Sequence, residues 1–217
     1  FRGVGVSAAS AAEMTAGWRA RQANKSPMNV ALRARLCAVD PVDQSAVAHV
    51  GALLAFTPSV VRNGGLMVFS FNSAATGEWA VRGLGDAHAR LINNEDGSAR
   101  VFVFNAPSVL SRFGFRDGNW QFGRSTSDAA AICLGALHAG GSVNKHGLKI
   151  TCPTSALLLT LMAVLARLGS TATPMAATVG VSLVPREFLA LLNRLGLDDI
   201  ADQYAQMVGP KMLGVRS

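Results

Sequence analysis

Hydrophobic and polar positions repeat with two different periods along this chain, and the change of period marks the predicted elements. Residues 40–56 place apolar side chains at helical spacing, after an acidic cap and a proline at Asp40-Pro41. Residues 66–71 instead alternate between two faces and are rich in Val and Phe, as a strand requires. The pattern therefore predicts a helix that leads into a β-sheet.

A small antiparallel sheet is predicted over residues 65–105. Residues 90–92 and 100–104 flank a polar segment with an Asp-Gly pair at 96–97, which is a strong hairpin signal. Residues 78–82 are a candidate hairpin partner for the strand that precedes them. The sheet would thus lie in the middle of the chain.

Helical spacing returns in the second half of the chain. Ser125 and Asp128 have the spacing of a capping box at the start of a helix. Pro153 and Pro185 begin two further apolar helices, and Asp198 caps a short last one. We therefore predict an α+β fold with a mainly helical body, a small antiparallel sheet in the middle and extended terminal arms.

The predicted domain organisation is one core between two arms. Residues 1–27 are the N-terminal arm, and residues 28–209 are the core, with the sheet at about 65–105 and a helical half at about 125–209. Residues 210–217 form the C-terminal tail. Because the first residue is Phe1 and not Met, we expect a trimmed N-terminus.

The charge of the chain indicates a polyanionic partner. It has 20 basic and 13 acidic residues, and 16 of the basic ones are Arg, whose planar fork of donors fits phosphate and stacks on bases. Basic zones at 1–39 and 99–152 flank an acidic stretch at 40–98. The two basic zones could line one groove; alternatively, the acidic stretch could meet the basic arm of a neighbouring copy.

Signatures of enzymes are absent from the sequence. It contains no GxSxG, P-loop, HExxH or GxGxxG motif, and the three cysteines lack the spacing of metal ligands. We therefore expect no catalysis, no metal and no cofactor. One alternative stays open, in which Cys133 or Cys152 is a nucleophile paired with His146. The longest apolar stretch, 156–168, is too short for a bilayer span, so no membrane partner is expected.

The residue types favour binding to an unpaired polynucleotide. In the second basic zone, Arg alternates with Phe and Trp, which suits stacking on bases together with neutralisation of the backbone. Residues 140–149 read as a Gly-rich basic loop that could follow phosphates with its N–H groups. The predicted RNA-binding residues are Arg33, Arg35, Arg112, Arg116, Arg124, Lys145 and Lys149.

Three stretches resemble helical viral coat proteins and nucleoproteins. Residues 123–128 (GRSTSD), before an Ala-rich helix, are similar to an Arg- and Asp-bearing stretch in coats of flexuous filamentous RNA viruses. Residues 212–216 (MLGVR) resemble a tail seen in some of those coats. Residues 185–189 (PREFL) through 196–198 (GLD) resemble a late helix in nucleoproteins of segmented negative-strand viruses.

This resemblance implies a structural coat or nucleocapsid subunit. Such a protein holds single-stranded RNA in a basic groove and polymerises through its terminal arms into a helical filament. Its place would be the virion and the host cytoplasm. The alternatives are a non-viral RNA-binding module, an enzyme with a cysteine nucleophile, and a protein–protein adaptor.

Overall fold

Two stretches of the chain build the same succession of elements, in which a helix, a hairpin, a helix, a hairpin and a helix follow one another. The computed structural model describes residues 26–213, apart from the side chains of Ser45 and Lys211. The first stretch comprises α3 (Val47–Phe56), β1 (Ser59–Asn63), β2 (Leu66–Phe71), α4 (Ala74–Leu84), β3 (Ala89–Asn93), β4 (Ala99–Val103) and α5 (Ala106–Ser111). The second comprises α6 (Thr126–Gly140), β7 (Gly141–Asn144), β8 (Gly147–Thr151), α7 (Ser155–Arg167), β9 (Thr173–Pro174), β10 (Gly180–Leu183) and α8 (Pro185–Arg194). The other described elements are α2 (Pro27–Cys37), α9 (Asp198–Val208), the two-residue strands β5 (Phe115–Arg116) and β6 (Asn119–Trp120), and the short 3-10 helices η1 (Gln44–Ala46) and η2 (Pro210–Leu213).

Each stretch forms a four-stranded antiparallel sheet, and the two sheets have corresponding strand orders. The order is β1-β2-β4-β3 in the first sheet and β7-β8-β10-β9 in the second. In both sheets the two hairpins meet through their second strands, because β2 pairs with β4 and β8 pairs with β10. The architecture is therefore a duplication.

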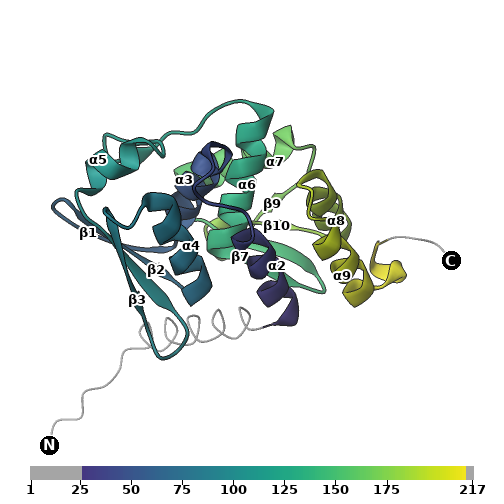
Figure 1. Cartoon of the computed structure of the whole chain (residues 1–217). Coiled ribbons are helices and arrows are strands. Elements are labelled where there is room, and N and C mark those ends of the chain that lie inside the picture. Colours follow the sequence, from purple (N-terminus) through teal and green to yellow (C-terminus); the bar gives the residue numbers. More distant parts are fainter. Residues whose placement is uncertain (1–25, 214–217) are drawn as a thin grey trace, which may run out of the picture.

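Helices cover one face of each sheet, and no described element covers the other (Figure 1). In β2 the burial alternates strictly, so that Met67, Phe69 and Phe71 are buried while the residues between them are partly exposed. A strand with this pattern has one face in the core and one in solvent. We call the faces turned away from the helices the open faces.

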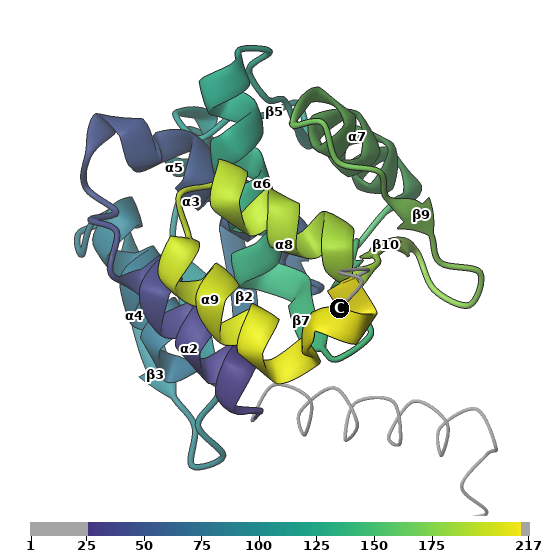
Figure 2. The ribbon, with the colours of Figure 1, turned by 90° about the vertical axis from the view of Figure 1, so that its right-hand side faces the viewer.

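Helix α9 packs between α2 and α8 at the edge of the second sheet (Figure 2). α2 begins at Pro27 behind the N-cap Ser26 and contacts α9, with Arg35 Nε 3.4 Å from Asp199 Oδ1. The buried Asn29 side chain accepts from Val143 N–H (2.8 Å) and donates to Val143 C=O (3.1 Å). These two bonds satisfy backbone groups on the outer edge of β7, which a sheet edge would otherwise leave unpaired.

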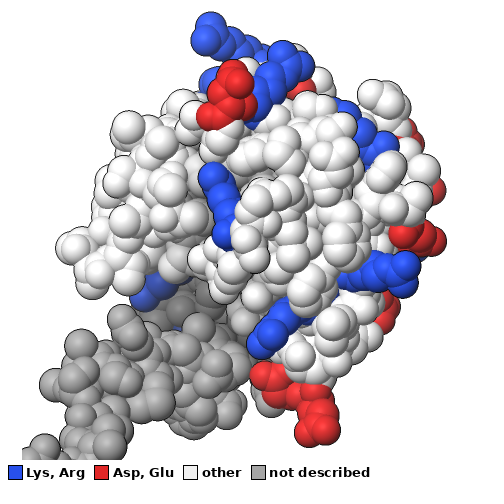
Figure 3. Space-filling view, turned by 90° about the vertical axis from the view of Figure 1, so that its left-hand side faces the viewer, with Lys and Arg blue, Asp and Glu red and all other residues white. Residues whose placement is uncertain are grey.

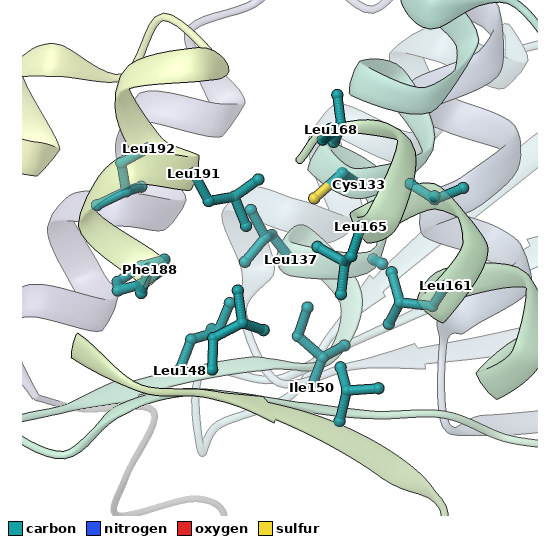
Figure 4. Packing of buried hydrophobic residues seen from close by; sticks show 14 of the residues in the cluster. Cys133, Leu137, Leu148, Ile150, Leu161, Leu165, Leu168, Phe188, Leu191 and Leu192 are labelled. Carbon is teal, nitrogen blue, oxygen red and sulfur yellow. The ribbon is translucent and has the colours of Figure 1, made fainter. Parts of the chain in front are cut away.

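The core of the second half lies between its sheet and its helices. Leu148 and Ile150 point from β8 toward α6, α7 and α8, where they meet Leu137, Leu165 and Leu191 among others (Figure 4). A corresponding cluster in the first half packs β2 and β4 against α3 and α4. Each sheet therefore has its own core on the helical side.

The two halves join where α3 and α6 cross. The segments in contact are similar in sequence: Gly51–Ala55 reads GALLA and Gly135–Ala139 reads GALHA. A Cβ at Gly135 would collide with the Ala52 side chain and would lie 2.7 Å from the carbonyl oxygen of His49 and from the amide nitrogen of Leu53. Because glycine has no side chain, α6 can lie directly against the backbone of α3.

Two histidines are buried beside this helix crossing. The ring centroids of His49 and His138 lie 5.6 Å apart, and Trp79 lies 4.6 Å and 5.1 Å from them. Nε2 of His138 contacts Thr76 Oγ1 at 3.2 Å and Cys37 Sγ at 3.4 Å. Burial lowers the pKa of His49 to about 4, and burial, together with the neighbouring His49 and Arg33, lowers the pKa of His138 as well.

The predicted α+β class with antiparallel strands is confirmed. The prediction of one sheet is wrong, because residues expected to be a loop at 140–149 form most of the β7–β8 hairpin of a second sheet. The expected hairpin partner at 78–82 is wrong too, since these residues belong to the amphipathic helix α4.

The N-terminal arm lies outside the described residues except for its last two, and the C-terminal tail begins with η2 and is described only to residue 213. Within residues 26–213, no helix is long and apolar enough to cross a bilayer.

We predict that Gly135→Ala destabilises the protein by about 1–3 kcal/mol, the usual cost of forcing extra atoms into a packed core. The added methyl group must push α6 away from α3. Gly65→Ala is the matched control, because the nearest atom to its Cβ is 4.0 Å away. Urea unfolding of the three proteins measures the difference. Equal losses in both variants would contradict the close helix contact.

We also predict that stability falls as the pH drops below about 6.5, the ordinary pKa of histidine in an unfolded chain. The folded protein keeps His49 neutral down to about pH 4, so its contribution is complete above pH 6.5 and is lost between these values. At about pH 5 the loss from this residue is about 2 kcal/mol relative to pH 7, from 1.36 kcal/mol per pKa unit. Urea unfolding at both pH values measures it. The variant His49→Phe should lose less stability than the wild type, and an equal loss would be evidence against this account.

Candidate nucleic-acid interface

Basic side chains lie on the open faces because the strands alternate. In β4, Arg100 lies between the buried residues Ala99 and Val101. In β8, Lys149 lies between two buried aliphatic residues, and in β3, Arg90 follows a buried alanine. Successive side chains of a strand point to opposite faces, so these three cations face away from the helices.

The strands carry positive charge and no negative charge. In the described part of the chain they contain Arg62, Arg90, Arg100, Arg116 and Lys149, and none of them contains Asp or Glu. All described acidic residues lie in helices, turns and loops. A surface built from these strands therefore favours an anion.

Polar groups accompany Lys149 across the second sheet. The strand register places Ser142, Lys149, Ser182 and Thr173 in one row from β7 to β9. Hydroxyl groups donate and accept hydrogen bonds, and the ammonium group donates three. This row can therefore bind phosphate oxygens and the edges of bases.

The open face of the first sheet is more apolar. One row places Ser70 and Ile92 on either side of Arg100, and the next places Val68 and Arg90 on either side of Phe102. Apolar side chains and guanidinium groups side by side can contact thymine methyl groups and guanine edges, respectively. The two sheets thus present different chemistry on equivalent faces.

Two of the predicted site residues belong to this interface. Lys149 is exposed on the open face of β8, and Lys145 is exposed in the turn that joins β7 to β8. In the same turn the Asn144 side chain accepts from the N–H of His146 at 2.7 Å. The segment predicted to be a loop is therefore a β-hairpin.

Arg33 and Arg35 lie elsewhere, on α2. The Arg35 guanidinium faces Asp199 of α9, and both side chains are more than a third exposed. Arg33 is half-buried, and its burial lowers its pKa. α2 packs on the helical side of the second sheet, next to α9. These two residues therefore do not lie on the open faces of the sheets.

The other three predicted residues surround the segment between α5 and α6. Arg112 donates to the carbonyl oxygens of Gly83 (2.6 Å) and Leu84 (3.3 Å), so it caps the end of α4. Arg116 is exposed in β5 and Arg124 is exposed before α6. The capping box predicted from Ser125 and Asp128 is present, since the Asp128 carboxylate accepts from the N–H and hydroxyl of Ser125. These bonds lower the pKa of Asp128.

Among the described residues, the two basic zones therefore do not come together in one groove, and four of the six basic residues of the first zone lie outside the described residues. The seven candidates divide among the open face, α2 and the segment before α6, which are different parts of the surface. On the side of the molecule that Figure 3 shows, Lys and Arg side chains lie at several separate places, some of them beside Asp and Glu, and form no continuous patch. Charge summed over a stretch of sequence does not show on which side of a strand or helix each residue lies.

Arg90 and Arg100 were missed as candidates. Their signal was the strand alternation itself: each is a charged residue within an otherwise apolar, alternating run. A charged residue at the second position of such a run lies on the face opposite the core.

Neither of the two helices that cross between the halves ends in a carboxylate residue. α3 ends at Phe56-Thr57, and α6 ends at Gly140-Gly141. Among the residues that the structure describes, no group of three or more His, Cys, Asp or Glu is placed to hold a metal ion.

The cysteine nucleophile is not supported by the geometry. Cys133 is fully buried, and burial raises its pKa to about 12. Burial also raises the pKa of Cys152 to about 11, while His146 is exposed in the β7–β8 turn. Only the thiolate is a strong nucleophile, and a raised pKa removes it near neutral pH.

Comparisons with known proteins identify the fold. Scans against protein-family models and against curated proteins find no match. Among solved structures, full-length DUF199/WhiA from Thermatoga maritima superposes with a TM-score of 0.63 at 14% identity, over 82% of this chain and 64% of that one. The N-terminal LAGLIDADG domain of DUF199/WhiA superposes with a TM-score of 0.61 at 13% identity, over 78% of this chain and 93% of that one. A variant of I-DmoI in complex with its target DNA has a TM-score of 0.50 at 14% identity, over 69% of this chain and 92% of that one.

These likenesses establish the fold, and this chain spans 64% of the length of full-length WhiA. They correct the resemblance to viral coats and nucleoproteins, which is wrong, together with the virion and host-cytoplasm location inferred from it. They also correct the RNA partner, because a structure of this fold is bound to DNA. The expectation that the chain is not an enzyme conflicts with the fold, since I-DmoI is a homing endonuclease.

Proposed function

We propose that this chain binds double-stranded DNA across the open faces of its two sheets. The observation that carries the proposal is the charge of the described strands, which contain basic but no acidic residues, with Arg90, Arg100 and Lys149 on the open faces. The fold supports the same ligand, because I-DmoI holds its target DNA with a comparable architecture.

The dimensions of a sheet suit a duplex better than a single strand. The major groove of B-DNA admits a two-stranded β-ribbon, and each base pair presents a distinct pattern of donors and acceptors there. Each half of this protein offers two hairpins joined edge to edge. Two sheets can therefore follow two successive parts of one duplex.

The two halves should read different sequences. The first sheet presents Arg90, Arg100 and apolar side chains, while the second presents Lys149 among hydroxyl groups. Arg hydrogen-bonds to guanine and apolar groups contact the methyl group of thymine, whereas Ser and Thr can hydrogen-bond to several bases. A preferred DNA site would therefore be asymmetric and not palindromic.

We predict that Arg100→Ala and Lys149→Ala each weaken duplex binding and reduce the slope of log affinity against log salt by about 1, as expected for one lost ionic contact. Arg124→Ala removes the same charge but should change neither quantity. Arg124 precedes α6, a helix of 15 residues, whose other end leads into β7, so it lies about 20 Å from the sheet at 1.5 Å per residue. Fluorescence anisotropy of a labelled duplex at several salt concentrations measures both. An equal effect in the Arg124 variant would contradict an interface on the open faces.

We further predict that the protein prefers duplex DNA to single-stranded RNA of the same length. The first reason is that the open faces carry rows of side chains suited to a groove of the duplex. The second is that the Phe and Trp residues expected to stack on bases pack against other rings of the protein. The ring centroids of Phe115 and Trp120 lie 5.0 Å apart, and those of Phe56 and Phe122 lie 6.3 Å apart. Competition of each unlabelled ligand against a labelled duplex tests this. If single-stranded RNA competes as well as duplex DNA, the proposed ligand is wrong.

A further inference from the structure

A second cationic site lies on the helical side of the first sheet. It is a pocket of about 800 Å³ between the β1–β2 hairpin, α5 and the β5–β6 turn. Three arginines line it: Arg62 of β1, Arg112 after α5 and Arg116 of β5. Its volume is within the range of small-molecule sites, roughly 300–1,000 Å³.

The pocket lies apart from the open faces. Met67 contributes to its lining, and this side chain belongs to the buried, helix-facing set of β2. The open face of the same strand is formed by its alternate residues, which pair across the sheet with Arg100 and Phe102. A ligand in this pocket would therefore be separated from the proposed DNA surface by the thickness of the sheet.

The charges in the pocket are not balanced within the described chain. None of the three arginines makes an ion pair, and Asp117 is the only acidic residue in the lining. Arg112 already donates to the end of α4, so it is a structural part of the wall. Arg116 is exposed, and Arg62 makes only a long bond of 3.4 Å to the carbonyl oxygen of Gly118. Arg62 and Arg116 therefore have donors available for an anion.

The rest of the lining suits a flat apolar group. Met67, Pro107 and Phe115 are on its walls. The Arg62 guanidinium is held 5.3 Å from the centroid of the Phe115 ring, which fixes its position. A guanidinium held in this way can stack on a base with its other face, and its edge can bind phosphate.

From this combination we propose that the pocket binds a nucleoside monophosphate, or a small aromatic phosphate of the same shape. The aromatic group lies against Met67, Pro107 and Arg62, and the phosphate is bound between Arg62 and Arg116. The site is independent of the proposed DNA surface. A ligand here could be held while the open faces are occupied.

AMP is the probe, with binding measured by isothermal titration calorimetry on the full chain. We expect 1:1 binding, and we expect adenosine and inorganic phosphate to bind at least about tenfold more weakly, since each makes only part of the contacts. Trp120 lies 5.0 Å from Phe115, so its fluorescence provides a second readout. Absence of AMP binding at about 1 mM would overturn the proposal, and so would inorganic phosphate binding as tightly as AMP.

Variants assign the binding to the pocket. Arg116→Ala and Arg62→Ala should each weaken AMP binding by about tenfold or more, as loss of a charge-assisted contact does. Arg116 is exposed and makes no described ion pair, so its variant should fold, which circular dichroism checks. Arg124→Ala, which removes an equal charge outside the pocket, should leave AMP binding unchanged.

The DNA surface is tested separately. The double variant Arg100→Ala/Lys149→Ala should lose duplex binding and retain AMP binding. If it loses AMP binding instead, the nucleotide binds on the open face and the pocket proposal is wrong. If neither the wild type nor any variant binds DNA, while AMP binding persists and depends on Arg116, only the proposed DNA function is wrong.

Discussion

The contact between α3 and α6 is the constraint on which the rest of the structure depends. Gly135 brings α6 against the backbone of α3, beside Ala52 and the carbonyl oxygen of His49. Each of these helices leads within three residues into the first strand of a sheet. The crossing of the two helices therefore sets how the two sheets lie relative to each other, and a wider contact would separate them. Small residues at a crossing are a general means of close approach between helices.

The packing of each sheet against its helices determines which charged side chains of the strands a ligand can reach. The described helices that pack on the faces of the sheets do so on one side, so the strands divide their residues between a core and a solvent face. Arg90, Arg100 and Lys149 lie on the solvent face because they alternate along their strands with residues that face the core. The first sheet in addition has a cationic pocket on its helical side, where Arg62 and Arg116 come together from two separate hairpins. Surfaces on the two sides of one sheet can thus bind different ligands.

The core carries polar groups whose ionisation opposes folding. His49 and His138 lie beside the helix crossing, and both rings contact Trp79 of α4. Nε2 of His49 and Nδ1 of His138 have no hydrogen-bond partner in the described chain. Burial keeps both rings neutral by lowering their pKa values. The contact that positions the sheets is therefore sensitive to acid.

The sequence by itself determined the local elements and the α+β class. Helix caps such as Ser125 with Asp128, and the alternation in β2, depend on residues close in the chain. It did not disclose the second sheet, because β7, β9 and β10 have two to four residues each and are stabilised by pairing with distant strands. The GALLA and GALHA segments were a visible signal of duplication, but their meaning depends on the packing of two helices 84 positions apart, as from Gly51 to Gly135. Only the tertiary structure decided which arginines share a surface, since a groove or pocket joins residues by their position in space and not by their order in the chain.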